Sequence, residues 1–190
     1  MTPKDAIALA KENNAKVVDI RYMDFIGTWQ HFSVPVSEFT ESAFEDGFGF
    51  DGSSMRAWQA INNSDMIVIP EAPTARMDPF FKVPTLAIIG NIHDPITSES
   101  YSRDPRGIAK KTEQYLKTTG LGDTIFVGPE PEFFIFSNIR YASEAHAAFF
   151  EIDSPEGHWN TGSDEMHNLG YKIKPKHGYF PLPPADQYQD

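Results

Sequence analysis

The sequence contains no cysteine among its 190 residues. Disulfide bonds and thiolate chemistry are therefore excluded, and the composition fits a reducing compartment. Positive charge is also scarce: 16 lysine and arginine residues face 27 aspartate and glutamate residues, which gives a net charge of −11. Nucleic acids and anionic membrane surfaces would be repelled, so we expect neither as a partner, whereas divalent cations would be attracted.

The chain also lacks a long apolar run. No segment approaches the roughly 18 apolar residues that a membrane span requires. Residues 1–14 carry Lys4, Asp5, Lys11 and Glu12 between their apolar side chains, so they lack the continuous apolar stretch of a secretion signal. We therefore expect a cytoplasmic protein, and 40 % hydrophobic residues are enough to build a core.

The first hundred residues show the alternation that is typical of a sheet. Lys16–Asp24 and Thr28–Val36 alternate on either side of Gly27, so they predict a β-hairpin. Thr2 and Pro3 suit the start of a helix that precedes this hairpin. The other elements predicted in this part are strands over residues 65–70 and 84–93, and mainly loop over residues 37–52.

A polar, turn-like segment over residues 95–104 separates two parts of the chain. We place a domain boundary there, with residues 1–100 in the first domain and 101–190 in the second. Asp104 and Gly120 mark the start and the end of a helix that follows the boundary. Beyond this helix we predict strands over residues 124–128 and 132–137 and an irregular, polar segment over 138–190.

Two carboxylates lie two residues apart, at Glu130 and Glu132. Side chains at this spacing share one face of an extended chain, where two carboxylates repel each other unless a cation lies between them. Mg²⁺ and Mn²⁺ prefer such oxygen ligands. A solvated acidic turn would show the same tripeptide, so the residues alone leave both interpretations open.

A second candidate site lies in the turn over residues 50–54. Asp51 is followed by Gly52 and by two hydroxyl side chains, one of them Ser54. A carboxylate held by a rigid turn could act as a general base or bind a cation, and the alternative is a tight loop without function. Trp58 follows shortly after, and a tryptophan is more often part of a core than a ligand contact.

Three motifs taken together resemble the glutamine synthetase family, type I (bacterial-type). The first is F-D-G-S-S at residues 50–54, continued by W-Q-A-I-N-N-S-D-M at 58–66. The others are G-P-E-P-E-F-F at 128–134 and G-Y-F-P-L-P-P at 178–184. Their order and spacing identify the chain as similar to the N-terminal portion of that family. One departure is Asn63, where the family usually has an acidic residue.

The resemblance implies an α+β fold, with a β-grasp-like N-terminal domain followed by the truncated start of a catalytic domain that has an antiparallel sheet and helices. It implies a glutamate–ammonia ligase that uses ATP to form glutamine through γ-glutamyl phosphate. In the complete enzyme it also implies a homo-oligomer of two hexameric rings, a dodecamer, whose active sites are shared between adjacent subunits.

The resemblance also assigns residues to the substrates glutamate, ammonium and ATP. Asp51, Ser54 and Tyr179 would line the ammonium pocket, and Trp58 would lie on the nucleotide side of the site. Ser54, Trp58 and Asp51 would serve the active site of a neighbouring subunit.

The acidic pair would hold the metals that the family uses, two Mg²⁺ or Mn²⁺ ions per complete site. Glu132 would bind the ion near glutamate and ammonia, and Glu130 the ion that holds the ATP phosphates. The family's remaining metal ligands lie beyond the equivalent of Asp190, so we expect a fragment that is inactive alone. Two alternatives stay open: a noncatalytic protein that assembles with full-length subunits, and a glutamate–amine ligase of the same family.

Overall fold

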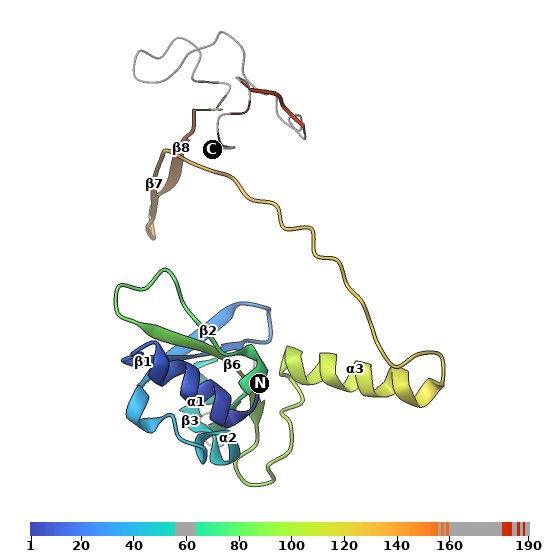
Figure 1. Ribbon diagram of the computed structural model, residues 1–190. Coiled ribbons are helices and arrows are strands. Elements are labelled where there is room, and N and C mark those ends of the chain that lie inside the picture. Colours follow the sequence, from blue (N-terminus) through green and yellow to red (C-terminus); the bar gives the residue numbers. More distant parts are fainter. Residues whose placement is uncertain are drawn as a thin grey trace. The chain divides into compact units, whose positions relative to one another are not determined.

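Two compact units, Met1–Phe126 and Val127–Asp190, make up the chain in the computed structural model (Figure 1). No helix in the described part of the chain is both long enough and apolar enough to cross a membrane. The structure describes residues 1–55, 64–155, 157, 159, 180–183, 186 and 188.

One mixed sheet dominates the first unit. Its six strands are β1 (Val17–Met23), β2 (Trp29–Pro35), β3 (Phe48–Asp51), β4 (Asp65–Pro70), β5 (Arg76–Met77) and β6 (Thr85–His93). The order is β2-β1-β6-β4-β3, and the short β5 pairs with β6 outside this path. β1 and β6 run parallel, and the other pairs are antiparallel. The sheet and its helices confirm the predicted α+β class.

The predicted hairpin is confirmed in β1 and β2. Gly27 turns the chain with φ +89°, a left-handed conformation that glycine adopts without steric cost. The buried carboxylate of Asp24 fixes the same turn, because its Oδ1 accepts the backbone N–H groups of Ile26 at 3.1 Å and Thr28 at 2.8 Å. The turn therefore satisfies its own backbone donors and sets the register of the two strands.

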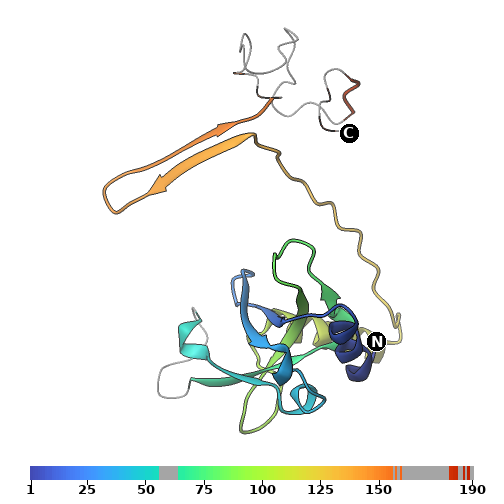
Figure 2. The ribbon, with the colours of Figure 1, turned by 60° about the vertical axis from the view of Figure 1, so that its left-hand side comes forward.

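The first helix, α1 (Pro3–Glu12), begins where the sequence predicts. The Thr2 hydroxyl accepts the backbone N–H of Asp5 at 3.3 Å, and the Asp5 carboxylate accepts that of Thr2 at 2.7 Å. This reciprocal cap satisfies two N–H groups that a helix start leaves without partners. Ala6 and Ala10 are buried, so small side chains let α1 lie close against the sheet (Figures 1 and 2).

The core lies between α1 and the central strands. In β6, residues 86–88 are buried, whereas Ile89 is half-buried. Side chains from three adjacent strands make up half of the buried core cluster: Val18, Ile20, Met66, Val68, Leu86, Ile88 and Ile92.

The long helix α3 (Pro105–Thr119) is also confirmed, with both predicted caps. Asp104 accepts the N–H of Arg106 at 3.0 Å, and Gly120 ends the helix in a left-handed conformation with φ +70°. The other carboxylate oxygen of Asp104 accepts the N–H of Ile92 from β6 at 3.1 Å. A single buried side chain therefore caps the helix and ties it to the sheet.

The loop predicted over residues 37–52 is wrong in part. It contains the short helices η1 (Val36–Glu38) and α2 (Ala43–Asp46), and it ends in β3. Phe48 and Phe50 alternate with glycine along β3 and pack against the core. The two phenylalanines supply the apolar face that makes this glycine-containing segment a strand rather than a loop.

The second unit contains a hairpin that the sequence analysis did not predict. β7 (Asn138–Ser143) and β8 (Ala148–Asp153) pair antiparallel, so the expectation of an irregular segment over 138–190 is wrong for these strands. Tyr141 lies opposite Phe150, and such aromatic cross-strand pairs stabilise a two-stranded ribbon.

The strands predicted over residues 124–128 and 132–137 are not formed. The chain runs through 124–136 without regular secondary structure, as an unpaired trace in Figure 2. A strand requires a neighbour that accepts and donates its backbone hydrogen bonds, and the described residues supply none here. Pro129 and Pro131 also lack the N–H group that a ladder would use.

Candidate functional site

The carboxylate of Asp51 is held by the turn that follows β3. Asp51 precedes the 3-10 helix η2 (Gly52–Ser54), and its Oδ1 accepts the backbone N–H of Ser53 at 2.8 Å and the Ser53 hydroxyl at 2.7 Å. The Ser54 hydroxyl donates to Oδ2 at 3.5 Å. The structure therefore brings together Asp51 and Ser54, two of the residues that the sequence analysis assigned to ammonium.

These hydrogen bonds also set the charge of the site. The hydroxyl and the backbone N–H of Ser53 contribute most to a lowered pKa of Asp51, and Ser64 and Ser54 add to the effect. Each donor stabilises the ionised form more than the protonated one. Asp51 is exposed, so the turn presents a fixed negative charge to solvent at neutral pH.

A second carboxylate lies opposite the first. The antiparallel register of β3 and β4 pairs Asp51 with Asp65, and the backbone N–H of Gly52 donates to the carbonyl oxygen of Ser64 at 2.7 Å just beyond this pair. Residues directly opposite each other in an antiparallel pair share one face of the sheet. Two like charges there are unfavourable unless a cation lies near them, so this end of the sheet attracts small cations.

Glu130 and Glu132 belong to the second unit and are both exposed. Their oxygens are the donors that Mg²⁺ and Mn²⁺ prefer, so the residue types fit a metal of this kind. Within the described ranges, however, no group of three or more histidine, aspartate or glutamate side chains could hold a metal ion. The two glutamates therefore supply a partial set of the about six ligands that Mg²⁺ takes.

Two further predicted residues, Trp58 and Tyr179, lie outside the described residues. Their assigned roles stay predictions that rest on the resemblance.

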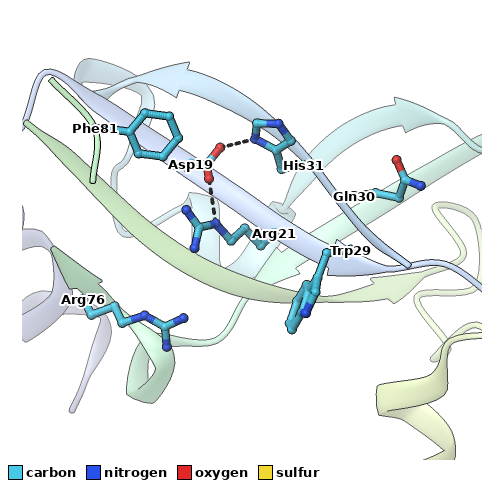
Figure 3. Close-up of a pocket in the computed structure, with 7 residues that line it drawn as sticks. All are labelled: Asp19, Arg21, Trp29, Gln30, His31, Arg76 and Phe81. Carbon is cyan, nitrogen blue, oxygen red and sulfur yellow. Dashed lines mark hydrogen bonds and ion pairs between the residues drawn. The ribbon is translucent and has the colours of Figure 1, made fainter. Parts of the chain in front are cut away.

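A pocket that the sequence analysis did not single out lies on the β1–β2 hairpin (Figure 3). Its volume is about 420 Å³. Asp19 and Arg21 alternate along β1, which could have indicated a polar face, but the other residues come from three separate segments. The lining residues are Asp19, Arg21, Trp29, Gln30, His31, Arg76 and Phe81.

Two family models match consecutive parts of the chain. Residues 14–95 match the family model described as glutamine synthetase, beta-Grasp domain, and residues 102–190 match the model described as glutamine synthetase, catalytic domain. The two models belong to one family and match consecutive parts of the chain.

Curated relatives show the same family. The glutamine synthetase of Mycolicibacterium smegmatis is 50 % identical over all of this chain and 40 % of its own length. The glutamine synthetase of Aquifex aeolicus is 49 % identical over 98 % of this chain and 39 % of its own length. The chain thus spans about 40 % of the length of the curated relatives it matches.

A solved structure shows the same fold. The Plasmodium falciparum glutamine synthetase matches all of this chain and 38 % of its own chain with a TM-score of 0.75 at 22 % sequence identity. A GmaS/ADP complex matches 60 % of this chain and 26 % of its own chain with a TM-score of 0.54 at 17 % identity. The chain therefore belongs to the glutamine synthetase family of ligases, as the β-grasp domain followed by the start of the catalytic domain.

Proposed function

We propose that this chain takes part in the ATP-dependent formation of glutamine from glutamate and ammonium. The observation that carries the proposal is the Asp51 turn, in which an exposed carboxylate is kept ionised by the two donors of Ser53. Ammonium is a small cation that must lose a proton before its nitrogen can act as a nucleophile. An ionised carboxylate attracts and holds that cation, and it can accept the proton as a general base when the nitrogen becomes the nucleophile.

The reaction needs two bond changes at the γ-carboxylate of glutamate. A carboxylate oxygen first takes the γ-phosphoryl group of ATP, which releases ADP and gives γ-glutamyl phosphate. The nitrogen of ammonia then attacks the activated carbonyl carbon, and phosphate leaves. Asp51 acts in the second step, with Ser54 beside it to hold the carboxylate.

The carboxylates of Glu130 and Glu132 have their role at two metal ions, Glu130 at the ion that holds the ATP phosphates and Glu132 at the ion near glutamate and ammonia. We infer that they would hold Mg²⁺ or Mn²⁺, which when bound would neutralise phosphate charge. Because no group of three or more such side chains could hold a metal within the described residues, we infer that further ligands join these two glutamates in the working site. The same proposal includes two further residues, Trp58 on the nucleotide side and Tyr179 in the ammonium pocket. It also includes the ring-forming homo-oligomer and the cytoplasmic location.

A chimaera tests the proposal. In it, these 190 residues replace the matching segment of the Mycolicibacterium smegmatis relative, which supplies the rest of a complete enzyme. We expect Asp51→Ala to lower kcat/KM for ammonium by about 100-fold or more, in the range that general acid–base groups contribute. Asp46→Ala removes the same charge from the exposed end of α2 and serves as the control.

Equal activity of the two variants would refute the role of Asp51. The same assay with methylamine in place of ammonium decides between an ammonia ligase and an amine ligase. We expect ammonium to be the preferred acceptor, because an ionised carboxylate attracts a small cation more strongly when no methyl group keeps the charges apart.

A further inference from the structure

We propose that the pocket on the β1–β2 hairpin binds a small organic carboxylate that carries a flat aromatic ring. This pocket lies within the first unit and shares no residue with the Asp51 turn. Its volume of about 420 Å³ falls in the range of small-molecule sites. The proposal does not depend on the proposed function.

The floor of the pocket is a fixed polar network around Asp19. The side chain of Asp19 is only 1 % exposed, and it accepts hydrogen bonds from Arg21 Nε at 2.7 Å and Ser33 Oγ at 3.1 Å. The Nδ1 atom of His31 lies 2.6 Å from Oδ1 of the same carboxylate. The guanidinium of Arg21, in direct contact with this buried carboxylate, offsets its negative charge.

Arg21 is held from two sides. Its Nη2 donates to Asp78 at 2.6 Å, while its Nε donates to Asp19. A guanidinium group has five N–H donors in a planar fork, and these two bonds use two of them. The remaining donors belong to a side chain that is one-quarter exposed and lines the pocket, so they are positioned before any ligand binds.

Arg76 is a cation of the pocket that takes no part in this network. Its side chain extends from β5 toward the space between Arg21 and Trp29 (Figure 3). Asp19 and Asp78 both pair with Arg21, whereas Arg76 has no ion-pair partner among the described residues. The planar guanidinium of Arg76 is exposed, and a single carboxylate would complete a bidentate pair with it.

Two aromatic rings lie at the rim of the same pocket. Trp29 is 52 % exposed and Phe81 is 49 % exposed, although both are large apolar side chains. Exposed rings gain free energy when another flat ring stacks on them and removes their surface from water. Arg76 would bind the carboxylate of a ligand, and the rings of Trp29 and Phe81 would contact its aromatic ring. These contacts define the class of ligand.

Benzoate is the simplest probe of this class. We would titrate benzoate into the isotopically labelled 190-residue chain and follow the Trp29 indole N–H signal by NMR, assigned with Trp29→Phe. We expect a saturable shift at millimolar concentration. Acetate lacks the ring and benzyl alcohol lacks the charge, so each should bind at least about tenfold more weakly, as expected for the loss of 1.4 kcal/mol or more.

Two matched variants separate a site from general charge attraction. Arg76→Gln should weaken benzoate binding by about tenfold, because a charge-assisted hydrogen bond is lost. Lys117→Gln removes the same charge from α3 and should leave the affinity unchanged within about twofold, and the NMR spectra report whether each variant is folded. Absence of a saturable Trp29 shift, or equal weakening in both folded variants, would overturn the proposal.

Discussion

The Nδ1 atom of His31 lies 2.6 Å from Oδ1 of Asp19, across the ladder that joins β1 to β2. The register places Asp19 opposite Ser33 and Arg21 opposite His31, so the carboxylate has partners on both strands. Burial alone would raise the pKa of Asp19, but the hydrogen bonds from His31, Arg21 and Ser33 outweigh it and hold the pKa below its ordinary value. The network therefore stabilises the hairpin only while Asp19 is ionised.

We predict that Asp19→Asn lowers the free energy of unfolding by about 2–4 kcal/mol at pH 7, because a buried ion pair loses its anionic partner. Urea unfolding followed by circular dichroism measures this change. Asp46→Asn, on an exposed side chain, is the control and should change stability by less than about 0.5 kcal/mol.

The pH dependence follows from the direction of the same pKa. The folded pKa of Asp19 is lowered from 3.8, so around that pH the unfolded state binds more protons than the folded state. The contribution of Asp19 is complete well above pH 3.8 and is lost as the pH falls through the folded value. The difference in stability between wild type and Asp19→Asn should therefore shrink as the pH is lowered below 4. A difference that grows on acidification would contradict this account.

A second prediction concerns the tie between α3 and the sheet. Asp104→Ala removes the acceptor for both Arg106 N–H and the buried Ile92 N–H. We expect a loss of about 2–3 kcal/mol, which combines a lost helix cap with an unsatisfied buried donor. Asp104→Asn keeps an acceptor oxygen and should lose less. If the two substitutions cost the same in urea unfolding, the hydrogen bonds are not what the side chain contributes.

A third prediction compares two glycines that both have open space around them. A Cβ atom at Gly27 or at Gly49 would meet no atom within 4 Å, but only Gly27 has a positive φ, of +89°. Gly27→Ala should therefore destabilise the protein by about 1 kcal/mol through backbone strain. Gly49→Ala should be neutral or slightly stabilising. Thermal unfolding of the pair checks this, and an equal effect would remove the role assigned to the hairpin turn.

Local signals in the sequence account for the elements that were predicted correctly. The caps of α1 and α3 and the glycine turn between β1 and β2 are each set by residues a few positions apart. The errors concern whether a segment finds a partner strand. Residues 124–137 have strand-forming composition but no neighbouring strand among the described residues. The strands β7 and β8 were missed because residues 138–190 were interpreted as one irregular segment, although the proline and glycine residues of that segment all follow β8.

The Asp51 turn and the pocket on the hairpin also differ in how far apart their residues lie in the sequence. The Asp51 turn was predicted because its donors, Ser53 and Ser54, are adjacent in the sequence and belong to a recognisable motif. The pocket on the hairpin was not, because Arg21 reaches Asp78 across 57 positions of the chain. Only the parallel pairing of β1 with β6 and the short strand β5 bring these residues together, and no motif in the sequence records that contact.

The most direct test of the central claim is a measurement of ¹⁵N-glutamine formed from glutamate, ¹⁵N-ammonium, ATP and Mg²⁺. It compares the 190-residue chain alone with the chimaera described above. We predict ATP-dependent glutamine formation by the chimaera and none above background by the chain alone, because its described residues supply only a partial metal site. Glutamine formed by the chain alone would contradict the account of a partial site, and a folded chimaera that forms none would contradict the proposed function.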